Sequence, residues 1–201
     1  MTRWEQFYAE DERILSAPVS YCAKNAVEVF TKHSKRVILD LGCGVGRDTF
    51  YLTENGFFVV GVDVAESALT IANRLRKGKQ RGITFVRADG RNLPFPKASF
   101  EGVYCFGLLH EFTGETKEDD IHEAMDEIYR VLESTGVLIL AVLSGDPDKG
   151  LPHVYLFTEQ MFDTATQAFQ VVNKREYYDI GCTGKKDYRV WYGVFTKQPF
   201  T

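Results

Sequence analysis

Short apolar runs alternate along this chain with segments whose apolar residues recur at helical spacing. Nearly continuous apolar runs occupy residues 37–41, 57–63, 83–88, 102–108 and 137–143. Runs of this length without polar alternation are typical of parallel strands that are buried on both faces. Because these runs are separated by helical patterns, the chain is predicted to be an α/β protein built on a largely parallel sheet.

The segments between the apolar runs show helical periodicity. In residues 121–132, for example, Ile121, Met125 and Ile128 recur at a spacing that places them on one face of a helix. The polar, acidic tract 113–120 before this helix is expected to be a loop, and residues 134–136 after it are expected to be a turn. Helices are predicted at residues 19–30, 48–54, 67–75 and 121–132, and after Thr158, which can cap a last helix.

The carboxyl-terminal part of the chain has a different pattern. Residues 169–178 and 188–195 each alternate between apolar and polar positions, and the glycine-containing tract 181–186 separates them. Two such runs joined by a short turn predict an antiparallel hairpin. The hairpin would bring the expected sheet to seven strands.

Composition narrows the class of protein. The chain has 201 residues, 44% of them hydrophobic, which suits one domain with its own core, 1–201. No apolar run reaches the roughly 18 residues of a membrane span, and the first residues lack the apolar stretch of a secretory signal. The formal net charge of −4 disfavours nucleic acid as a partner, because an acidic field repels phosphates. The four cysteines are scattered, so no metal site or disulfide framework is indicated, and a cytoplasmic location is expected.

The most informative stretch is Asp40-Leu41-Gly42-Cys43-Gly44-Val45-Gly46-Arg47, directly after the first strand. A strand, a glycine turn and a helix start form the local pattern of a nucleotide-handling site. The spacing is G-x-G-x-G, whereas a dinucleotide turn reads G-x-G-x-x-G. Asp40 would repel a pyrophosphate but attract an ammonium and a sulfonium. The stretch therefore favours a cationic amino-acid nucleoside as the ligand.

This stretch resembles the first motif of class I S-adenosylmethionine-dependent methyltransferases. The resemblance covers roughly residues 37–196 and includes 89–100, where an acid is followed by Leu-Pro-Phe. It implies the Rossmann-like sandwich of that family, with a seven-stranded, mostly parallel sheet that ends in an antiparallel hairpin. It also implies that S-adenosylmethionine is the cofactor and S-adenosylhomocysteine the product. The short chain favours a small-molecule acceptor.

The methionine and ribose parts of this cofactor would lie against the first two strands. Asp63 ends the second strand, where a carboxylate can accept two hydrogen bonds from a ribose diol. The alternative for Asp63 is a plain N-cap of the next helix. The residues expected around these two parts are Asp40, Gly42, Cys43, Gly44, Gly46 and Asp63.

The adenine would lie beside residues that follow the second and third strands. Val64 could lie against its face. The resemblance implies that Asp89 accepts a hydrogen bond from the exocyclic amine, while Gly90 allows close approach of the base. A surface turn is the alternative for this pair. Phe106, near the end of the fourth strand, completes the expected cofactor-binding set.

The segment after the fourth strand should face the transferable methyl group, since ligands bind at the carboxyl ends of parallel strands. His110 and Glu111 are adjacent titratable residues there. The pKa of an ordinary histidine is near neutrality, so His110 could take a proton from an amine or hydroxyl acceptor. The alternative is that His110 only shapes the pocket wall.

Residues 1–34 are expected to form a helical lid on a cofactor-binding core of residues 35–201. Trp4, Tyr8 and Tyr21 could cover the cofactor, as the amino-terminal segment often does in the resembled family. The alternative is that these aromatic residues simply pack on the edge of the sheet.

Two other functions fit part of the pattern. A nicotinamide-dependent oxidoreductase would explain Asp63, but it would not explain the glycine spacing or Asp40. A non-catalytic protein that binds S-adenosylmethionine without converting it fits the sequence as well. Both alternatives share the predicted α/β fold.

Overall fold

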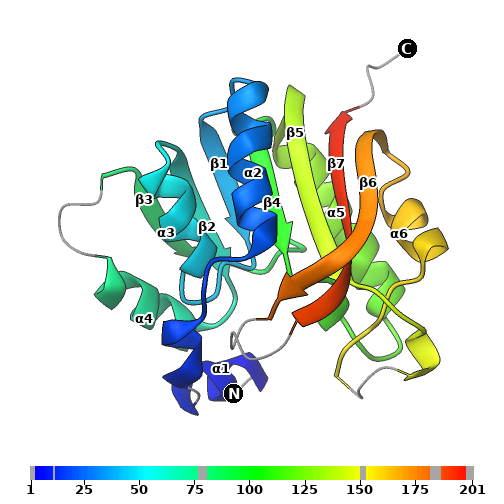
Figure 1. The fold of residues 1–201 in the computed structure, drawn as a ribbon, viewed down its shortest axis with the longest axis horizontal. Helices are drawn as coiled ribbons and strands as arrows, with labels where there is room; N and C mark the ends of the chain where they lie inside the picture. Colours follow the sequence, from blue (N-terminus) through cyan, green and yellow to red (C-terminus); the bar gives the residue numbers. More distant parts are fainter. Residues whose placement is uncertain (1–2, 11, 77–80, 150–152, 182–186, 198–201) are drawn as a thin grey trace.

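A seven-stranded sheet with the strand order β3-β2-β1-β4-β5-β7-β6 forms the centre of the computed structural model (Figure 1). The structure describes residues 3–10, 12–76, 81–149, 153–181 and 187–197. Strand β7 is antiparallel to both β5 and β6, and the other pairs are parallel. The strands are β1 (Val37–Leu41), β2 (Phe58–Asp63), β3 (Ile83–Arg87), β4 (Phe100–Phe106), β5 (Leu132–Leu143), β6 (Phe169–Ile180) and β7 (Asp187–Lys197).

This arrangement confirms the predicted α/β fold, with its mostly parallel sheet and its antiparallel hairpin at the carboxyl end. The tract predicted to join the hairpin, 181–186, lies outside the described residues except for Gly181. Among the residues that the structure describes, no helix has the length and apolarity that a bilayer crossing requires.

Helices cover both faces of the sheet, because successive residues of a buried strand point to opposite sides. On one face, Ile38 of β1 and Tyr104 of β4 pack in a core cluster with Phe30. On the other face, Leu39 and Val103 of the same strands pack with residues of the last two helices. The first face carries α2 (Tyr21–Lys32) and α3 (Arg47–Glu54), and the second carries α5 (Lys117–Val131) and α6 (Glu159–Ala165).

Two connections differ from the prediction. Helix α5 begins at Lys117, inside the tract that was expected to be a loop. Its first turn holds three acids, which stabilise the positive end of the helix dipole. Strand β5 begins at Leu132, before the expected turn at 134–136, because Leu132 pairs with Phe100 and Val137 pairs with Gly102. The intervening residues form an irregularity within this strand pair rather than a separate turn.

The amino-terminal segment has more structure than its scattered apolar residues predict. A helix, α1 (Arg3–Glu10), and a 3-10 helix, η1 (Glu12–Ser16), precede α2. Helix α1 lies below the carboxyl ends of the parallel strands, beside α4 (Glu66–Leu75) (Figure 1). Glu5 connects the two helices, since its carboxylate accepts hydrogen bonds from the amides of Glu66 and Ser67 at 2.7 and 3.0 Å. It supplies an acceptor that the N-cap residue Ala65 lacks.

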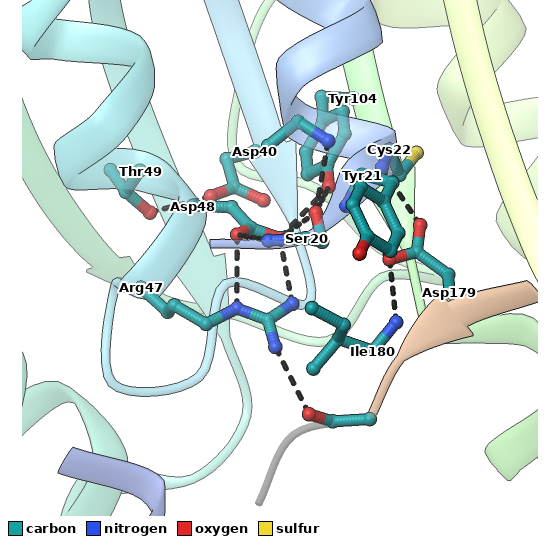
Figure 2. A network of polar contacts seen from close by, with 12 residues as sticks. Ser20, Tyr21, Cys22, Asp40, Arg47, Asp48, Thr49, Tyr104, Asp179 and Ile180 are labelled. Carbon is teal, nitrogen blue, oxygen red and sulfur yellow. Dashed lines mark hydrogen bonds and ion pairs between the residues drawn. The ribbon is translucent and has the colours of Figure 1, made fainter. Parts of the chain in front are cut away.

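A buried carboxylate fixes the start of α3 against α2 and β4 (Figure 2). Asp48 accepts hydrogen bonds from Ser20 N at 3.1 Å, Ser20 Oγ at 2.8 Å and the Tyr104 hydroxyl at 2.9 Å. Arg47 forms a two-pronged ion pair with it, at 2.9 Å for both nitrogens. Burial alone would raise the pKa of Asp48, but the charge and hydrogen bonds of Arg47, together with those of Ser20, hold this pKa below its ordinary value.

Asp179, near the end of β6, extends this network to the hairpin (Figure 2). Its carboxylate accepts hydrogen bonds from the amides of Tyr21 and Cys22 at 2.8 and 2.7 Å. These are first-turn amides of α2, which have no acceptor within the helix itself. Arg47 adds a hydrogen bond of 3.3 Å to the Gly181 carbonyl. The network therefore joins the starts of α2 and α3 to β4 and to the end of β6.

We predict that Asp48→Asn lowers the free energy of unfolding by about 3 kcal/mol at pH 7, because it leaves Arg47 without its buried partner. The pKa of Asp48 is lower in the folded state than its ordinary value of 3.8, so its contribution is present above that value. It disappears as the pH falls through the folded value. Chemical denaturation at neutral and acidic pH should therefore show a shrinking gap between wild type and variant. Asp163→Asn, at a half-exposed ion pair, is the control and should change little.

A second prediction concerns Gly102 of β4, where α2 lies close to the sheet. A Cβ atom at Gly102 would lie 2.6 Å from Phe30 Cε1 and 2.7 Å from Ile38 Cδ1. Gly102→Ala should therefore lower the free energy of unfolding by about 1–3 kcal/mol through overpacking. Adding Phe30→Leu should recover part of this loss in a denaturant titration. If the changes in unfolding free energy of Gly102→Ala and Phe30→Leu simply added in the double variant, this result would contradict the close contact.

Candidate active site

The glycine turn after β1 has the backbone conformation that only glycine adopts easily. Gly42, Gly44 and Gly46 have φ angles of 81°, 54° and 84°. The turn is held to β2 because the amides of Gly42 and Cys43 both donate to the Val62 carbonyl, at 2.8 and 3.0 Å. The strand, turn and helix that the sequence predicts here are therefore all present.

A cavity of about 890 Å³ opens at the carboxyl ends of the parallel strands, beside the glycine turn. Its wall includes both polar tips of strands and aromatic residues of α1. The predicted residues that line it are Asp40, Gly42, Cys43, Gly44, Asp63, Val64, Asp89, Gly90, Phe106 and His110. The structure thus brings together all but one of the site residues that the sequence predicts.

Gly46 is the exception, because it is absent from the cavity wall. A Cβ atom there would lie 3.0 Å from the rings of Phe50 and Phe85. Gly46 also occupies the N-cap position of α3 in the left-handed conformation. Its place in the structure is thus explained by the path of the chain into α3.

Asp40 is buried at the end of β1. The pKa of its carboxyl is raised to about 7, because burial raises it most and the charge of Asp48 adds to the rise, while the hydrogen bond from Thr49 opposes it. The group is therefore poised between its neutral and charged forms near pH 7. A cation in the cavity would favour the carboxylate, which is the charge complementarity expected from the sequence.

Asp63 takes part in two backbone hydrogen bonds and still faces the cavity. Its oxygens accept from Gly44 N at 2.8 Å and from Ala65 N at 2.9 Å. Burial raises the pKa of its carboxyl, while these amides oppose the rise. Each carboxylate oxygen can accept a second hydrogen bond, so capacity for a diol remains. The N-cap of α4 is Ala65, so the alternative that Asp63 is a plain N-cap is wrong.

Asp89 lies at the cavity wall but is already paired. Arg91 donates to its two oxygens at 3.0 and 2.6 Å, and the Arg91 amide donates to one of them at 3.0 Å. These hydrogen bonds hold the pKa of Asp89 below its ordinary value. The local turn considered for this pair is present, as a bridge between Asp89 and Asn92. An adenine amine would have to share the carboxylate with Arg91.

His110 lies in η2 (Leu109–Glu111), a 3-10 helix after β4. Its Nδ1 accepts a hydrogen bond from the Leu143 amide at 3.2 Å, so the neutral ring carries its proton on Nε2. The pKa of His110 is lowered to about 3, mainly by burial and also by the nearby charge of Arg3. Both observations argue against the general-base role expected for His110.

The three aromatic residues considered for the lid are not equivalent in the structure. Trp4 and Tyr8 of α1 line the cavity, and the Tyr8 hydroxyl lies 2.6 Å from the place that a Gly44 Cβ would occupy. Tyr21 is 45% exposed and is absent from the wall. Of the three, only Trp4 and Tyr8 are therefore placed at the cavity.

Sequence reasoning missed several polar residues of the wall. Arg47 and Asp48 follow the third glycine directly. This adjacent pair of opposite charges at the start of a helix could have indicated an ion pair beside the glycine turn. Tyr104 and Asp179 come from distant parts of the chain and carry no motif of their own. All four line the cavity and belong to the network that fixes the turn.

Known proteins resemble this chain in sequence. The chain matches the family described as "Methyltransferase domain" over residues 39–140. It is 31% identical over 134 residues to a demethylmenaquinone methyltransferase of Thermus thermophilus, covering 66% of this chain and 58% of that one. It is 33% identical over 115 residues to a glycine/sarcosine N-methyltransferase of Parasynechococcus marenigrum, covering 57% and 40%. The chain thus spans roughly half of the length of these curated relatives.

Solved structures share the fold at lower identity. A structure described as "Conversion of a Disulfide Bond into a Thioacetal Group during Echinomycin Biosynthesis" superposes with a TM-score of 0.74 at 20% identity, covering 97% of this chain and 91% of that one. The Burkholderia thailandensis 1,6-didemethyltoxoflavin-N1-methyltransferase, with S-adenosylhomocysteine bound, gives a TM-score of 0.62 at 22% identity, covering 88% and 79%. Because the family match spans half of the chain and contains the glycine turn, the resemblance seen in the sequence is confirmed, and the chain belongs to the class I S-adenosylmethionine-dependent methyltransferases.

Proposed function

We propose that this chain transfers a methyl group from S-adenosylmethionine to a small-molecule acceptor and releases S-adenosylhomocysteine. The observation that carries the proposal is the convergence of Asp40, Asp63 and Asp89, at the carboxyl ends of neighbouring strands, on one cavity beside the glycine turn. Carboxyls at this place complement a ligand with an ammonium, a sulfonium and a ribose diol. The family assignment supports the same cofactor.

The proposed positions of the cofactor follow from the wall of the cavity. The methionine part would lie along the glycine turn, and Asp63 would hold the ribose with the acceptor capacity that the backbone leaves free. Gly46 would act by directing the chain into α3. The residues proposed around the adenine are Val64, Asp89 and Gly90. Phe106 completes the proposed cofactor-binding wall, and its ring centroid lies 5.6 Å from the guanidinium carbon of Arg47.

When bound, the sulfonium supplies an electrophilic methyl carbon and a neutral thioether as the leaving group. The protein would contribute alignment of the acceptor and exclusion of water. Helix α1 supports this role, because Trp4 and Tyr8 cover the cavity and Glu5 ties the helix to α4. We therefore propose α1 as the lid over the core.

Small molecules are the proposed acceptor class. Two relatives are named for demethylmenaquinone and for glycine or sarcosine, which supports an acceptor of this size. The cytoplasmic location stays a prediction, supported by Cys22, Cys43 and Cys105, which are buried and unpaired. The match to a methyltransferase family argues against the nicotinamide-dependent alternative, and turnover would separate an enzyme from a non-catalytic binding protein.

We predict that S-adenosylhomocysteine stabilises the purified protein and that NADH does not. At a hundred times its Kd, a ligand that binds only the folded state adds about 2.7 kcal/mol, which appears as a raised Tm. Asp63→Ala should weaken binding about tenfold or more, because hydrogen bonds to a charged group contribute roughly 1.5–3 kcal/mol each. Asp119→Ala, at an exposed acid of α5 outside the cavity wall, is the matched control. Stabilisation by NADH alone would contradict the proposal.

A further inference from the structure

Glu111, beside His110 in η2, is a largely buried acid of the cavity wall. Its side chain is 12% exposed. Its buried Oε2 atom has Arg3 as an ion-pair partner, 3.2 Å from Nη1, but accepts no hydrogen bond of good geometry within the described part of the chain. A buried carboxylate with only a poorly aligned partner is costly, so this one has acceptor capacity for a donor that arrives with a ligand.

The position of Glu111 relative to the glycine turn follows from the sheet. Strand β4 lies beside β1, and η2 continues from β4 toward the cavity. Leu108, just before η2, lies within 3.1 Å of the place that a Gly42 Cβ would occupy. Glu111 thus stands on the segment that touches the proposed methionine site, where the transferable methyl group would emerge.

The groups around Glu111 partner it only in part. Arg3 Nη1 lies 3.2 Å from Oε2 and also donates a shorter hydrogen bond, of 2.7 Å, to the His153 carbonyl. The Trp4 side chain also donates to the carboxylate. His110 Nε2 lies 3.6 Å from the other oxygen, too far for a hydrogen bond. Burial raises the pKa of Glu111 to about 7, against the opposing charge of Arg3. A carboxyl with such a pKa suits proton transfer at neutral pH.

We propose that Glu111 binds the nucleophilic atom of an acceptor that carries an N–H or O–H group, and takes the proton from that atom during methyl transfer. This inference rests on the function proposed above. It narrows the acceptor class to amines and hydroxyl compounds, and it assigns to Glu111 the role that the sequence suggested for His110.

The reaction balances without a further reactant. The lone pair of the acceptor nitrogen or oxygen attacks the methyl carbon, and the new C–N or C–O bond forms as the C–S bond breaks. The electron pair of the C–S bond stays on sulfur, which becomes the neutral thioether of the product. The acceptor proton passes to the Glu111 carboxylate, and the carboxylic acid later loses it to solvent.

A purely structural role for Glu111 makes a different prediction. If the carboxylate served only to hold Arg3 and thereby α1, removing either partner would have the same effect on every ligand of the cavity. A test must therefore distinguish recognition at the methyl position from general closure of α1. Two cofactor analogues that differ only at that position provide this distinction.

The test compares S-adenosylhomocysteine with sinefungin, an analogue in which an amine-bearing carbon replaces the sulfur and its methyl group. The amine of sinefungin stands at the methyl position and offers the N–H donors that the acceptor would present. Calorimetry should give a ratio of the sinefungin Kd to the S-adenosylhomocysteine Kd that is about tenfold higher in Glu111→Gln than in wild type. Glu111→Asp, which keeps the charge, should give a ratio closer to that of wild type.

Arg3→Gln is the matched control. It removes the same ion pair and leaves the carboxylate free for the ligand, so its ratio should equal or fall below that of wild type. Equal ratios in wild type, Glu111→Gln and Arg3→Gln would overturn the role of Glu111 while S-adenosylhomocysteine binding still supported the proposed function. Failure of wild type to bind S-adenosylhomocysteine at all would instead overturn the proposed function, and this inference with it.

Discussion

The buried carboxylate of Asp48 is the constraint on which the arrangement of the site depends. A lone buried charge would be strongly unfavourable, and here Arg47, Ser20 and Tyr104 offset that cost together. Because these partners come from different elements, satisfying the charge also fixes α2, α3 and β4 relative to one another. The glycine turn lies directly before Asp48, so its unusual backbone is held by the same contacts.

Two carboxyls of the cavity wall would carry negative charge that burial disfavours. Asp40 and Asp63 both have raised pKa values for this reason, and Asp48 adds to the rise at Asp40. The charge of Arg47 opposes the rise at Asp40, although Arg47 is itself paired with Asp48. Perturbed carboxyls gathered in one cavity are typical of functional sites. A cationic ligand would lower the electrostatic cost of ionising these carboxyls, which relates the predicted specificity to the burial of the cavity wall.

The local motif and the buried strands were predictable from the sequence, because both depend on neighbouring residues. The predicted cavity residues from Asp40 to Gly90 lie at, or just after, the carboxyl ends of strands that the apolar runs define. Parallel strands place these ends at one edge of the sheet. Contacts between distant segments left no such pattern. The pairing of Asp179 with the start of α2, and of Arg3 with Glu111, depends on how the termini pack. The start of α5 was missed because its acidic first turn resembles a loop in composition.

The hydrogen bonds of Glu5 to the amides of Glu66 and Ser67 have a consequence for ligand exchange. Those amides have no other side-chain cap, so lifting α1 away from the cavity also uncovers the first turn of α4. The backbone amides of Glu66 and Ser67 therefore lose their protection whenever α1 opens away from the cavity. Their hydrogen–deuterium exchange rates reveal how often the mouth opens, without a chemical label and without any knowledge of the acceptor.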